Sequence, residues 1–533
     1  MPPDVPPTVP PTVPPTVPPT VPPTIPPTIP PTIPPTIPPI TSPTAPSKYQ
    51  WQYPALTPNQ LDVIQGDIWS KGFPKHNETY YLFKIAPGNA TAFAQCLRKM
   101  VVDQPELISN LKSTKKARDD IAAEKQRAKV ASKLGLPNGK PEKLHMSFAL
   151  IAFTYKGLNM VGKTDPAFFK GMKSDGDALN DAKTGLDPLL ANANEIHGLI
   201  KVAGCSTGSV NGRLEKLQAA LQRGTVIQDV PGGAEGRLDG ATREEPFRGK
   251  EHFGFEDGIS QPLMNGIDDT PPVPDPGALA EFNMDTEQSI LVVTGTTRHE
   301  NSSARRPDWM HDGSFLVFRK LEQDVGAFRQ LKASFATYQC ESAAHMGAPL
   351  TLPAYYTTDA PPADHEKVKA MNNFGYVKVD DDKLAACPFA AHIRKTNPRR
   401  FGEWDANSGD QGLKFAKMVR CGIAYGTDYT EGEPAGLQRG LLFACYQACI
   451  EDGFRHMQLA WSNKNSFPGS KSGLDPIVGQ APAGEAVKTF VTDKKGNKKE
   501  VLITAPLVTF KGGEYFFVPS ITALKGVLTE APL

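Results

Sequence analysis

The sequence is poor in cysteine, in excess charge of either sign and in long apolar stretches, and each shortage excludes a class of protein. Seven cysteines are scattered over 533 residues without a paired short-spacing framework, so we expect free thiols rather than a disulfide scaffold. Lys and Arg total 58 against 57 for Asp and Glu, which argues against nucleic acid as a partner. No window approaches the roughly 18 apolar residues that span a bilayer, so we expect no membrane span.

Proline dominates the beginning of the chain. Over residues 5–40 a Val/Ile-Pro-Pro-Thr unit repeats, and its paired prolines forbid helix and favour the polyproline II form. We expect residues 1–46 to be a polyproline II or disordered tail, either an inert linker or a ligand for an unknown partner. A classical signal peptide is lacking, so the compartment stays open between an intracellular site and non-classical export.

The rest of the chain has the pattern of an α+β architecture built twice. Its length suggests two folded units. Strands are predicted over residues 79–85, 146–154, 289–294, 315–320 and 514–518, and helices over 90–102, 107–133 and 324–337. The charged helix 107–133 is expected to be a solvated surface helix. Proline density at 272–276 interrupts both patterns, which predicts an N-terminal domain over 47–271 and a C-terminal domain over 277–533.

Residues 252–262, HFGFEDGISQP, carry two adjacent carboxylates, Glu256 and Asp257, between two glycines. A carboxylate between Phe255 and a glycine turn could have a shifted pKa and exchange protons with a substrate. An ordinary turn in which Asp257 accepts backbone hydrogen bonds explains the pattern equally well. A third possibility is a glycoside hydrolase in which Glu256 or Asp257 pairs with a distant carboxylate.

Residues 387–400, CPFAAHIRKTNPRR, place His392 in a short apolar run that is followed by basic residues. A neutral imidazole suits a metal as an axial ligand, and arginines such as Arg394 pair well with carboxylates such as haem propionates. Taken alone, His392 is more often a satisfied core histidine. Two rival histidines are weaker: His252 lies only five residues before Asp257, and His456 is expected to face solvent.

Two further stretches are individually weak signals. VRCGIAYG, at residues 419–426, places Arg420 before a glycine turn, and RGLLFACYQ, at 439–447, reads as a buried strand or the start of a helix.

Together and in this order, the blocks closely resemble the fungal dye-decolourising peroxidases, and the likeness covers about residues 60–524. The blocks are GFEDGISQP at 254–262, AAHIRKTNPR at 390–399, VRCGIAYG at 419–426, GLLFACYQ at 440–447 with GFRHMQLAW at 453–461, and GGEYFFVPS at 512–520. The stretch LDVIQGDIWSKGFP at 61–74 is similar to the opening segment of that family.

The resemblance implies a fold, a cofactor and a reaction. The fold is a pair of ferredoxin-like α+β domains with antiparallel sheets and surrounding helices, the dimeric α/β-barrel type. The cofactor is haem b, one per chain. The partners are hydrogen peroxide and aromatic reductants, and dyes and phenols are oxidised in one-electron steps by way of a ferryl intermediate. A protein of the same lineage that binds or delivers haem without peroxidase turnover is the alternative.

Carried over by position, the resemblance also implies residue roles. Asp257 is the distal acid–base group, Arg420 the distal cation and His392 the proximal ligand of the haem iron. Leu441 and Phe443 line the pocket beside them. These types suit peroxide cleavage, because a carboxylate relays a proton and a guanidinium keeps its charge where negative charge develops.

Three positions stay open in that assignment. A carboxylate supports the proximal histidine in this family, and Asp475 is preferred over Glu451 for that role. Trp461 matches a surface tryptophan that passes electrons in some relatives, with a core-anchoring tryptophan as the equal alternative. Ala424 replaces the usual proline of the family, which relaxes the turn after Arg420 without removing its charge.

Overall fold

The protein is described here by a computed structural model. It describes residues 51–529 except 52, 137–138, 166–167, 169–170, 256–257, 259, 270–285, 295–297, 300–301, 338–389, 397, 399–414, 435, 468–471, 483, 493–497 and 527. The predicted tail, residues 1–46, and the predicted boundary at 272–276 lie outside these residues. The chain from Ser47 to Leu533 forms one compact unit.

The described part of the first half of this unit contains five strands and seven α-helices. The strands are β1 (Asn77–Ile85), β2 (Ser147–Phe153), β3 (Gly198–Gly204), β4 (Ile227–Asp229) and β5 (Arg237–Ala241). The helices are α1 (Pro58–Val63), α2 (Ala90–Asp103), α3 (Leu111–Lys133), α4 (Tyr155–Met160), α5 (Gly171–Leu179), α6 (Pro188–Ala191) and α7 (Thr207–Ala220), with short 3₁₀ turns η1 (Pro105–Leu107), η3 (Ala193–Glu195) and η4 (Ala234–Gly236).

The second half repeats the mixture of strands and helices. The strands are β6 (Arg298–His299), β7 (Ser302–Arg305), β8 (Ser314–Gln323), β9 (Val419–Arg420), β10 (Ile423–Tyr425), β11 (Gly440–Gln447), β12 (Val487–Thr492), β13 (Lys498–Ile503) and β14 (Val508–Val518). The helices are α8 (Gln288–Leu291), α9 (Val325–Thr337), α11 (His392–Thr396) and α14 (Ile521–Lys525), the 3₁₀ turn η5 (Asp308–Met310), and the π-helical turns η8 (Glu451–Arg455) and η9 (Met457–Ser462).

Most elements predicted from periodicity are confirmed, with ends that shift by a few residues. The strand predicted over 289–294 is wrong, because its first residues form the short helix α8. A short apolar run has no periodicity that separates a strand from a buried helical turn. Strand β3 was not predicted at all.

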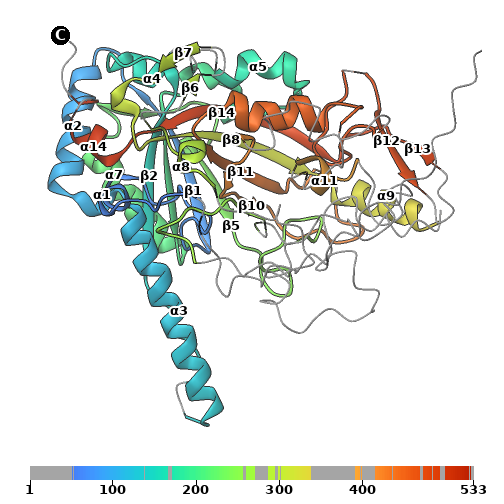
Figure 1. Ribbon diagram of the computed structural model, residues 1–533, viewed down its shortest axis with the longest axis horizontal. Helices are drawn as coiled ribbons and strands as arrows, with labels where there is room; N and C mark the ends of the chain where they lie inside the picture. Colours follow the sequence, from blue (N-terminus) through green and yellow to red (C-terminus); the bar gives the residue numbers. More distant parts are fainter. Residues whose placement is uncertain are drawn as a thin grey trace, which may run out of the picture. The chain divides into compact units, whose positions relative to one another are not determined.

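One large antiparallel sheet of ten strands joins the two halves. Its order is β10-β11-β8-β14-β2-β3-β1-β4, with β5 beside β1 and β9 beside β11. The halves meet where β14 pairs with β2, through Phe517 and Phe153. The prediction of an α+β fold with antiparallel sheets is confirmed (Figure 1), whereas the division at 271–277 stays a prediction.

The sheet curls until its two ends meet. The rings of Tyr80 in β1 and Phe318 in β8 lie 4.5 Å apart, although three strands separate β1 from β8 in the sheet. At the ends, a Cβ on Gly240 of β5 would lie 2.8 Å from the carbonyl oxygen of Ala424 in β10. The face that carries Tyr80 and Phe318 is therefore enclosed, and we call it the inner face; the opposite one is the outer face.

Alternation along the strands divides the core between these faces. Leu442, Ala444 and Tyr446 of β11 belong to the inner cluster, whereas Cys445 belongs to the outer one, as do Phe93 of α2 and Leu214 of α7. The outer face is thus covered by helices where it packs a core.

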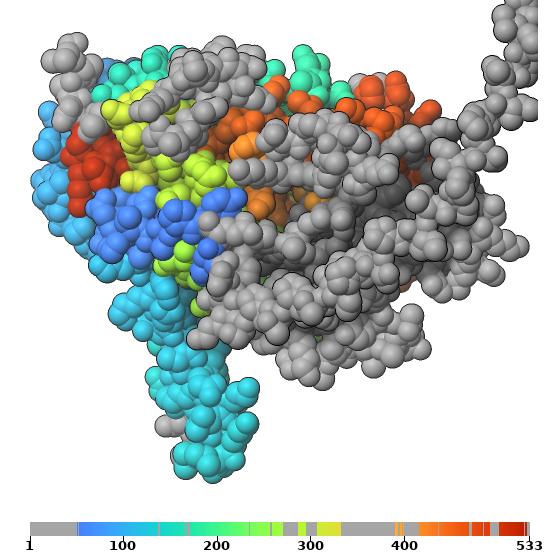
Figure 2. Space-filling model, viewed as in Figure 1, coloured from blue at the N-terminus to red at the C-terminus, as the bar shows by residue number. Residues whose placement is uncertain are grey.

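Helix α3 reaches away from this sheet, as Figures 1 and 2 show. Ion pairs with i,i+4 spacing follow its surface, including Lys115 with Asp119 and Lys116 with Asp120. The predicted solvated surface helix is confirmed. Among the helices that the structure describes, none is both long enough and apolar enough to cross a membrane.

Candidate functional site

His392 lies at the start of α11 with its ring against a buried carboxylate. Its Nδ1 is 2.8 Å from Oδ2 of Asp475, and the Asp475 side chain has no exposed area, whereas that of His392 is 31% exposed. The structure brings together the histidine and the carboxylate that the resemblance paired. Glu451, the alternative, lies in η8, where its carboxylate accepts a hydrogen bond from the thiol of Cys449.

The backbone holds Asp475 in a fixed orientation. Its Oδ1 accepts hydrogen bonds from the amides of Ile477 at 2.8 Å and Val478 at 3.2 Å. One carboxylate oxygen is therefore occupied by the backbone and the other faces the imidazole. A carboxylate placed in this way fixes the orientation of a histidine ligand and raises its basicity.

Lys395 anchors α11 one turn after His392. Its buried Nζ donates to the carbonyl oxygens of Trp461, at 3.0 Å, and Lys464, at 2.8 Å. Burial lowers the pKa of Lys395 to about 7, although the charge of Asp475 opposes this shift. The short helix is thus tied to η9 and to the segment that follows it.

Arg420 is held by the segment that follows the GFEDG turn. The side-chain amide of Gln261 donates to the carbonyl oxygen of Arg420 at 2.6 Å and accepts from the Arg420 amide at 3.1 Å. At the other end of the same segment, Nε2 of His252 is 2.8 Å from the carbonyl oxygen of Tyr425. The two described ends of this stretch, His252 and Gln261, therefore lie beside β10 and β9.

Three of the predicted site residues, Arg420, Leu441 and Phe443, share the outer face. Arg420 pairs directly with Cys445 in the ladder between β9 and β11, so both side chains project to one side of the sheet. Leu441 and Phe443 precede Cys445 by even numbers of residues on β11 and therefore project to the same side. Both are partly exposed.

An apolar cluster joins three of the sequence blocks. Phe255 of the GFEDG turn belongs to the same buried cluster as Leu474 and Ile477, which flank Asp475. Leu321, which pairs with Leu441 in the ladder between β8 and β11, packs against this cluster. The turn, the support of His392 and the strand that carries Leu441 thus meet in one region.

Three predicted residues lie wholly or partly outside the described residues. Asp257 and its neighbour Glu256 lie outside the described residues, and the side chain of Arg394 does as well, although its backbone belongs to α11. Their roles stay predictions.

Neither rival histidine has a better claim to the metal. His252 is buried against the backbone of Tyr425, and burial lowers the pKa of its imidazole to about 4. The ring of His456 packs edge-on against that of Trp461, with 5.2 Å between centroids and its Nε2 buried. The expectation that His456 faces solvent is therefore wrong.

The proposed surface tryptophan needs the same correction. Trp461 is only 2% exposed and stacks on Phe467, with 5.2 Å between ring centroids and 7° between planes. An apolar ring gains most by burial, and the structure gives Trp461 the alternative role, that of a core anchor.

Two residues of the region around Arg420, Gln261 and Lys201, were not predicted from the sequence. Gln261 stood inside the recognised block, but nothing in its residue type pointed to Arg420, which is 159 positions away. Lys201 was missed as well, although a lysine within the apolar strand Gly198–Gly204 is a detectable signal because charged side chains are rarely fully buried without partners.

Comparison with known proteins defines the class and then the family. Residues 63–234 match the family model described as the DyP dimeric alpha+beta barrel domain. Peroxidase 2 of Mycetinis scorodonius is 31% identical over 510 residues, which cover 88% of this chain and 88% of the relative. A dye-decolorizing peroxidase of Mycena epipterygia is 32% identical over 427 residues, covering 71% of this chain and 75% of the relative.

The solved structures agree. A structure of an ancestral D-type dye decolorizing peroxidase superposes with a TM-score of 0.71 at 31% identity, covering 90% of this chain and all of that one. The chain therefore belongs to the dye-decolourising peroxidases. It is an enzyme, a peroxidase, which sets aside both the haem carrier without turnover and the glycoside hydrolase.

Peroxidases of this family depend on haem, and the described residues fit that group. Among the residues that the structure describes, no three His, Cys, Asp or Glu side chains gather to hold a bare metal ion. The donor set at α11 is instead one imidazole backed by a buried carboxylate, and such a supported imidazole would suit a haem iron as its protein ligand.

Proposed function

We propose that this chain binds one haem b and uses hydrogen peroxide to oxidise dyes, phenols and other aromatic reductants. Support for phenols comes from a solved dye-decolorizing peroxidase complex with 2,6-dimethoxyphenol, which superposes with a TM-score of 0.68 at 28% identity, covering 89% of this chain. The observation that carries the proposal is the 2.8 Å contact between His392 and Asp475.

His392 would bind the iron through Nε2, the ring nitrogen that does not face Asp475. The carboxylate of Asp475 holds the proton on Nδ1 and so selects the tautomer with Nε2 as the ligand. Arg394, in the same helix, would pair with a propionate. Haem, when bound, supplies the iron that exchanges electrons with peroxide and with the reductant.

On the distal side, Arg420 and Asp257 would have separate roles in the reaction with peroxide. The guanidinium of Arg420 stabilises negative charge that develops on the peroxide oxygens. The carboxylate of Asp257 accepts a proton from one peroxide oxygen and returns it to the other, so that water leaves. Leu441 and Phe443 exclude water from this space and raise the strength of both interactions.

Two adjacent carboxylates allow a matched test. After haem supplementation, absorption spectra of the full-length chain are recorded before and after mixing with hydrogen peroxide, for the native protein, Asp257→Asn and Glu256→Gln. Asp257→Asn should retain haem but react about a hundredfold or more slowly, since the amide keeps the volume and loses the base. Glu256→Gln should react at nearly the native rate.

Two results would oppose the proposal. Native speed in Asp257→Asn would remove the acid–base role. Protein that stays colourless after haem supplementation would remove the haem site.

A further inference from the structure

A buried ionic network occupies the inner face, on the other side of the sheet from the proposed site. The side chains of Lys201, Asp67 and Glu78 have no exposed area, and Nζ of Lys201 lies 2.6 Å from Asp67 and 3.0 Å from Glu78. Two tyrosines complete it: Tyr446 donates to Asp67 at 2.7 Å and Tyr80 to Glu78 at 3.0 Å. Burying this many charges is costly unless each is paired.

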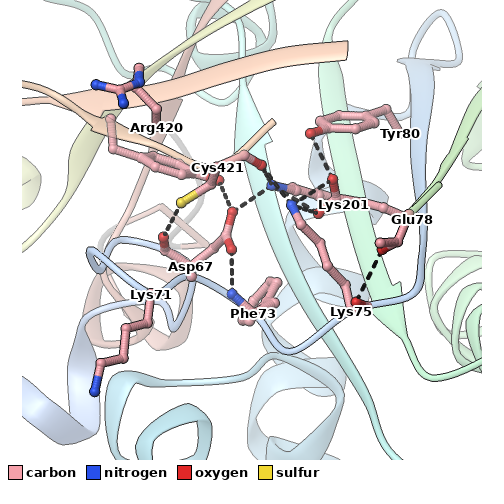
Figure 3. A network of polar contacts seen from close by, with 12 residues as sticks. Asp67, Lys71, Phe73, Lys75, Glu78, Tyr80, Lys201, Arg420 and Cys421 are labelled. Carbon is pink, nitrogen blue, oxygen red and sulfur yellow. Dashed lines mark hydrogen bonds and ion pairs between the residues drawn. The ribbon is translucent and has the colours of Figure 1, made fainter. Parts of the chain in front are cut away.

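The network converges on one backbone atom beside Arg420. Lys201 and Lys75 both donate from Nζ to the carbonyl oxygen of Cys421, at 2.9 Å and 2.8 Å (Figure 3). The thiol of Cys421 donates to the carbonyl oxygen of Asp67 at 3.4 Å. The residue that follows Arg420 is thus held by two cations and by its own side chain.

Close packing keeps the loop of Asp67 against this residue. Gly72 has a φ of +52°, and a Cβ there would lie 2.9 Å from Sγ of Cys421. The Asp67 carboxylate reaches across the loop to accept a hydrogen bond from the Phe73 amide at 2.8 Å. The loop that carries Asp67 therefore has little freedom to move away from Cys421.

Local pairing alone gives Arg420 weak support. Strand β9 is only two residues long, Val419–Arg420, and short strands have few ladder bonds. Gln261 holds the Arg420 peptide from one side, and the lysines hold the next carbonyl from the other. Successive side chains point to opposite faces, and Figure 3 shows the Arg420 guanidinium directed away from the network.

We propose that Lys201, oriented by Asp67 and Glu78 and assisted by Lys75, is a positioning residue for Arg420. By fixing the Cys421 carbonyl on the inner face, it fixes the direction in which the Arg420 side chain leaves the strand on the outer face. This inference rests on the proposed role of Arg420 toward peroxide. Small displacements of a catalytic group slow a reaction strongly. A buried network that prevents such a displacement would therefore serve the reaction as well as stability.

The charge of Lys201 persists at working pH. Burial alone would lower the pKa of its ammonium group, but the charges of Asp67 and Glu78 raise this pKa well above its usual range. Lys75 is 18% exposed and shares Glu78 with Lys201, so its contribution is the smaller one.

A double-mutant cycle tests the coupling between the two faces. The rate constant for reaction with hydrogen peroxide is measured in the haem-loaded full chain for the native protein, Lys201→Met, Arg420→Leu and the double variant. Lys201→Met alone should slow the reaction about tenfold to a hundredfold. In the Arg420→Leu background the same change should cost less than about twofold, because the group it positions is gone.

Two measurements besides turnover separate positioning from general damage. Affinity for fluoride, an anion that accepts hydrogen bonds from a distal cation, should weaken about as much as the rate in Lys201→Met and should show the same dependence on Arg420. Amide hydrogen exchange over residues 419–425 of the haem-free chain should quicken in Lys201→Met.

The matched control is Lys320→Met. Lys320 is also largely buried and its Nζ also lies 2.6 Å from an aspartate, Asp187, but it makes no contact with Cys421 among the described interactions. The Lys320→Met variant should react with peroxide at close to the native rate. If Lys201→Met does not fold, Lys75→Met is measured in its place, because it removes one donor to Cys421 and leaves the ion pairs of Lys201 intact. Lys75→Met should slow the reaction about threefold, again only when Arg420 is present.

The possible failures are distinct. An Arg420→Leu variant as fast as the native protein would refute the proposed role of Arg420 and the positioning with it. A slow Arg420→Leu, combined with an equal effect of Lys201→Met in both backgrounds, would refute the positioning alone.

Discussion

The polar groups on the two faces of the sheet differ in how far they are buried and paired. On the inner face, Lys201, Asp67 and Glu78 have no exposed area and every charge meets a partner inside the fold. On the outer side, the carboxylate of Asp475 is fully buried while the imidazole it supports is 31% exposed. Groups that hold the backbone can be fully buried if every charge is paired. A group proposed to bind a cofactor must instead stay partly accessible, and a buried partner can orient it.

A second comparison is between two buried carboxyl groups, Glu514 and Asp67. Burial raises the pKa of Glu514 in β14 to about 7, although the amides of Met172 and Tyr515 donate to its carboxylate and oppose the shift. Glu514 accepts hydrogen bonds from two amides and holds its proton up to about pH 7, whereas the nearby charge of Lys201 lowers the pKa of Asp67. The partner, more than the depth, decides the charge state.

The largest effect expected on the outer side follows from removing the imidazole. His392→Ala should lose haem and lower peroxidase activity by about a thousandfold or more, since the residue proposed to hold the iron is removed. The measurement is the haem absorbance per protein together with dye oxidation. His456→Gln, which removes one of the two rival histidines, should keep both haem and activity. Haem loss in His456→Gln with haem retained in His392→Ala would reverse the assignment.

The second effect sharpens the role of the supporting carboxylate. Asp475→Asn keeps the acceptor for the amides of Ile477 and Val478 but loses the charge that faces Nδ1 of His392. Haem affinity or activity should fall about tenfold to a hundredfold. Glu451→Gln is the control, and an equal loss in that variant would mean that the choice between the two carboxylates is wrong.

The third effect concerns stability against pH. Between its ordinary value of 4.5 and the raised pKa of about 7, Glu514 holds a proton in the folded state that the unfolded chain releases. The folded state binds more protons there, so its stability falls as pH rises through this window, by at most about 3 kcal/mol.

Glu514→Gln should remove that part of the dependence and gain relative stability above pH 7. Urea denaturation at several pH values measures it, with the exposed Glu485→Gln as a control that leaves the dependence intact. Parallel stability curves for the native protein and Glu514→Gln would show that the carboxyl is ionised throughout.

The smallest expected effect is on stability, when single tyrosine hydroxyl groups of the inner face are removed. Tyr446→Phe removes the hydrogen bond to Asp67 and should destabilise the fold by about 1–2 kcal/mol. Tyr425→Phe is the matched comparison, because the buried hydroxyl of Tyr425 has no hydrogen-bond partner in the part of the chain that the structure describes. Its loss should be neutral or slightly stabilising in chemical denaturation. Equal losses in both variants would mean that the charged partner adds nothing.

Periodicity found the long elements because their patterns are local. Strand β8 and helix α3 are recognisable from their own residues, whereas residues 289–294 have an apolar run too short to distinguish a strand from the helical turn of α8. Strand β3 was overlooked although Lys201 stands within an apolar run, and the acidic partners of that lysine, Asp67 and Glu78, lie in other segments of the chain.

By itself the sequence determined the family, the antiparallel α+β fold, and the candidate set of His392, Arg420, Leu441, Phe443 and Asp475, because ordered blocks of residue types survive without any knowledge of distance. Only the tertiary structure decided that Asp475 rather than Glu451 lies against His392, that Trp461 is buried, and that Lys201 reaches the backbone beside Arg420. The physical reason is that pairing and burial depend on side chains brought together from segments up to hundreds of residues apart, and only the curled sheet fixes which of them meet.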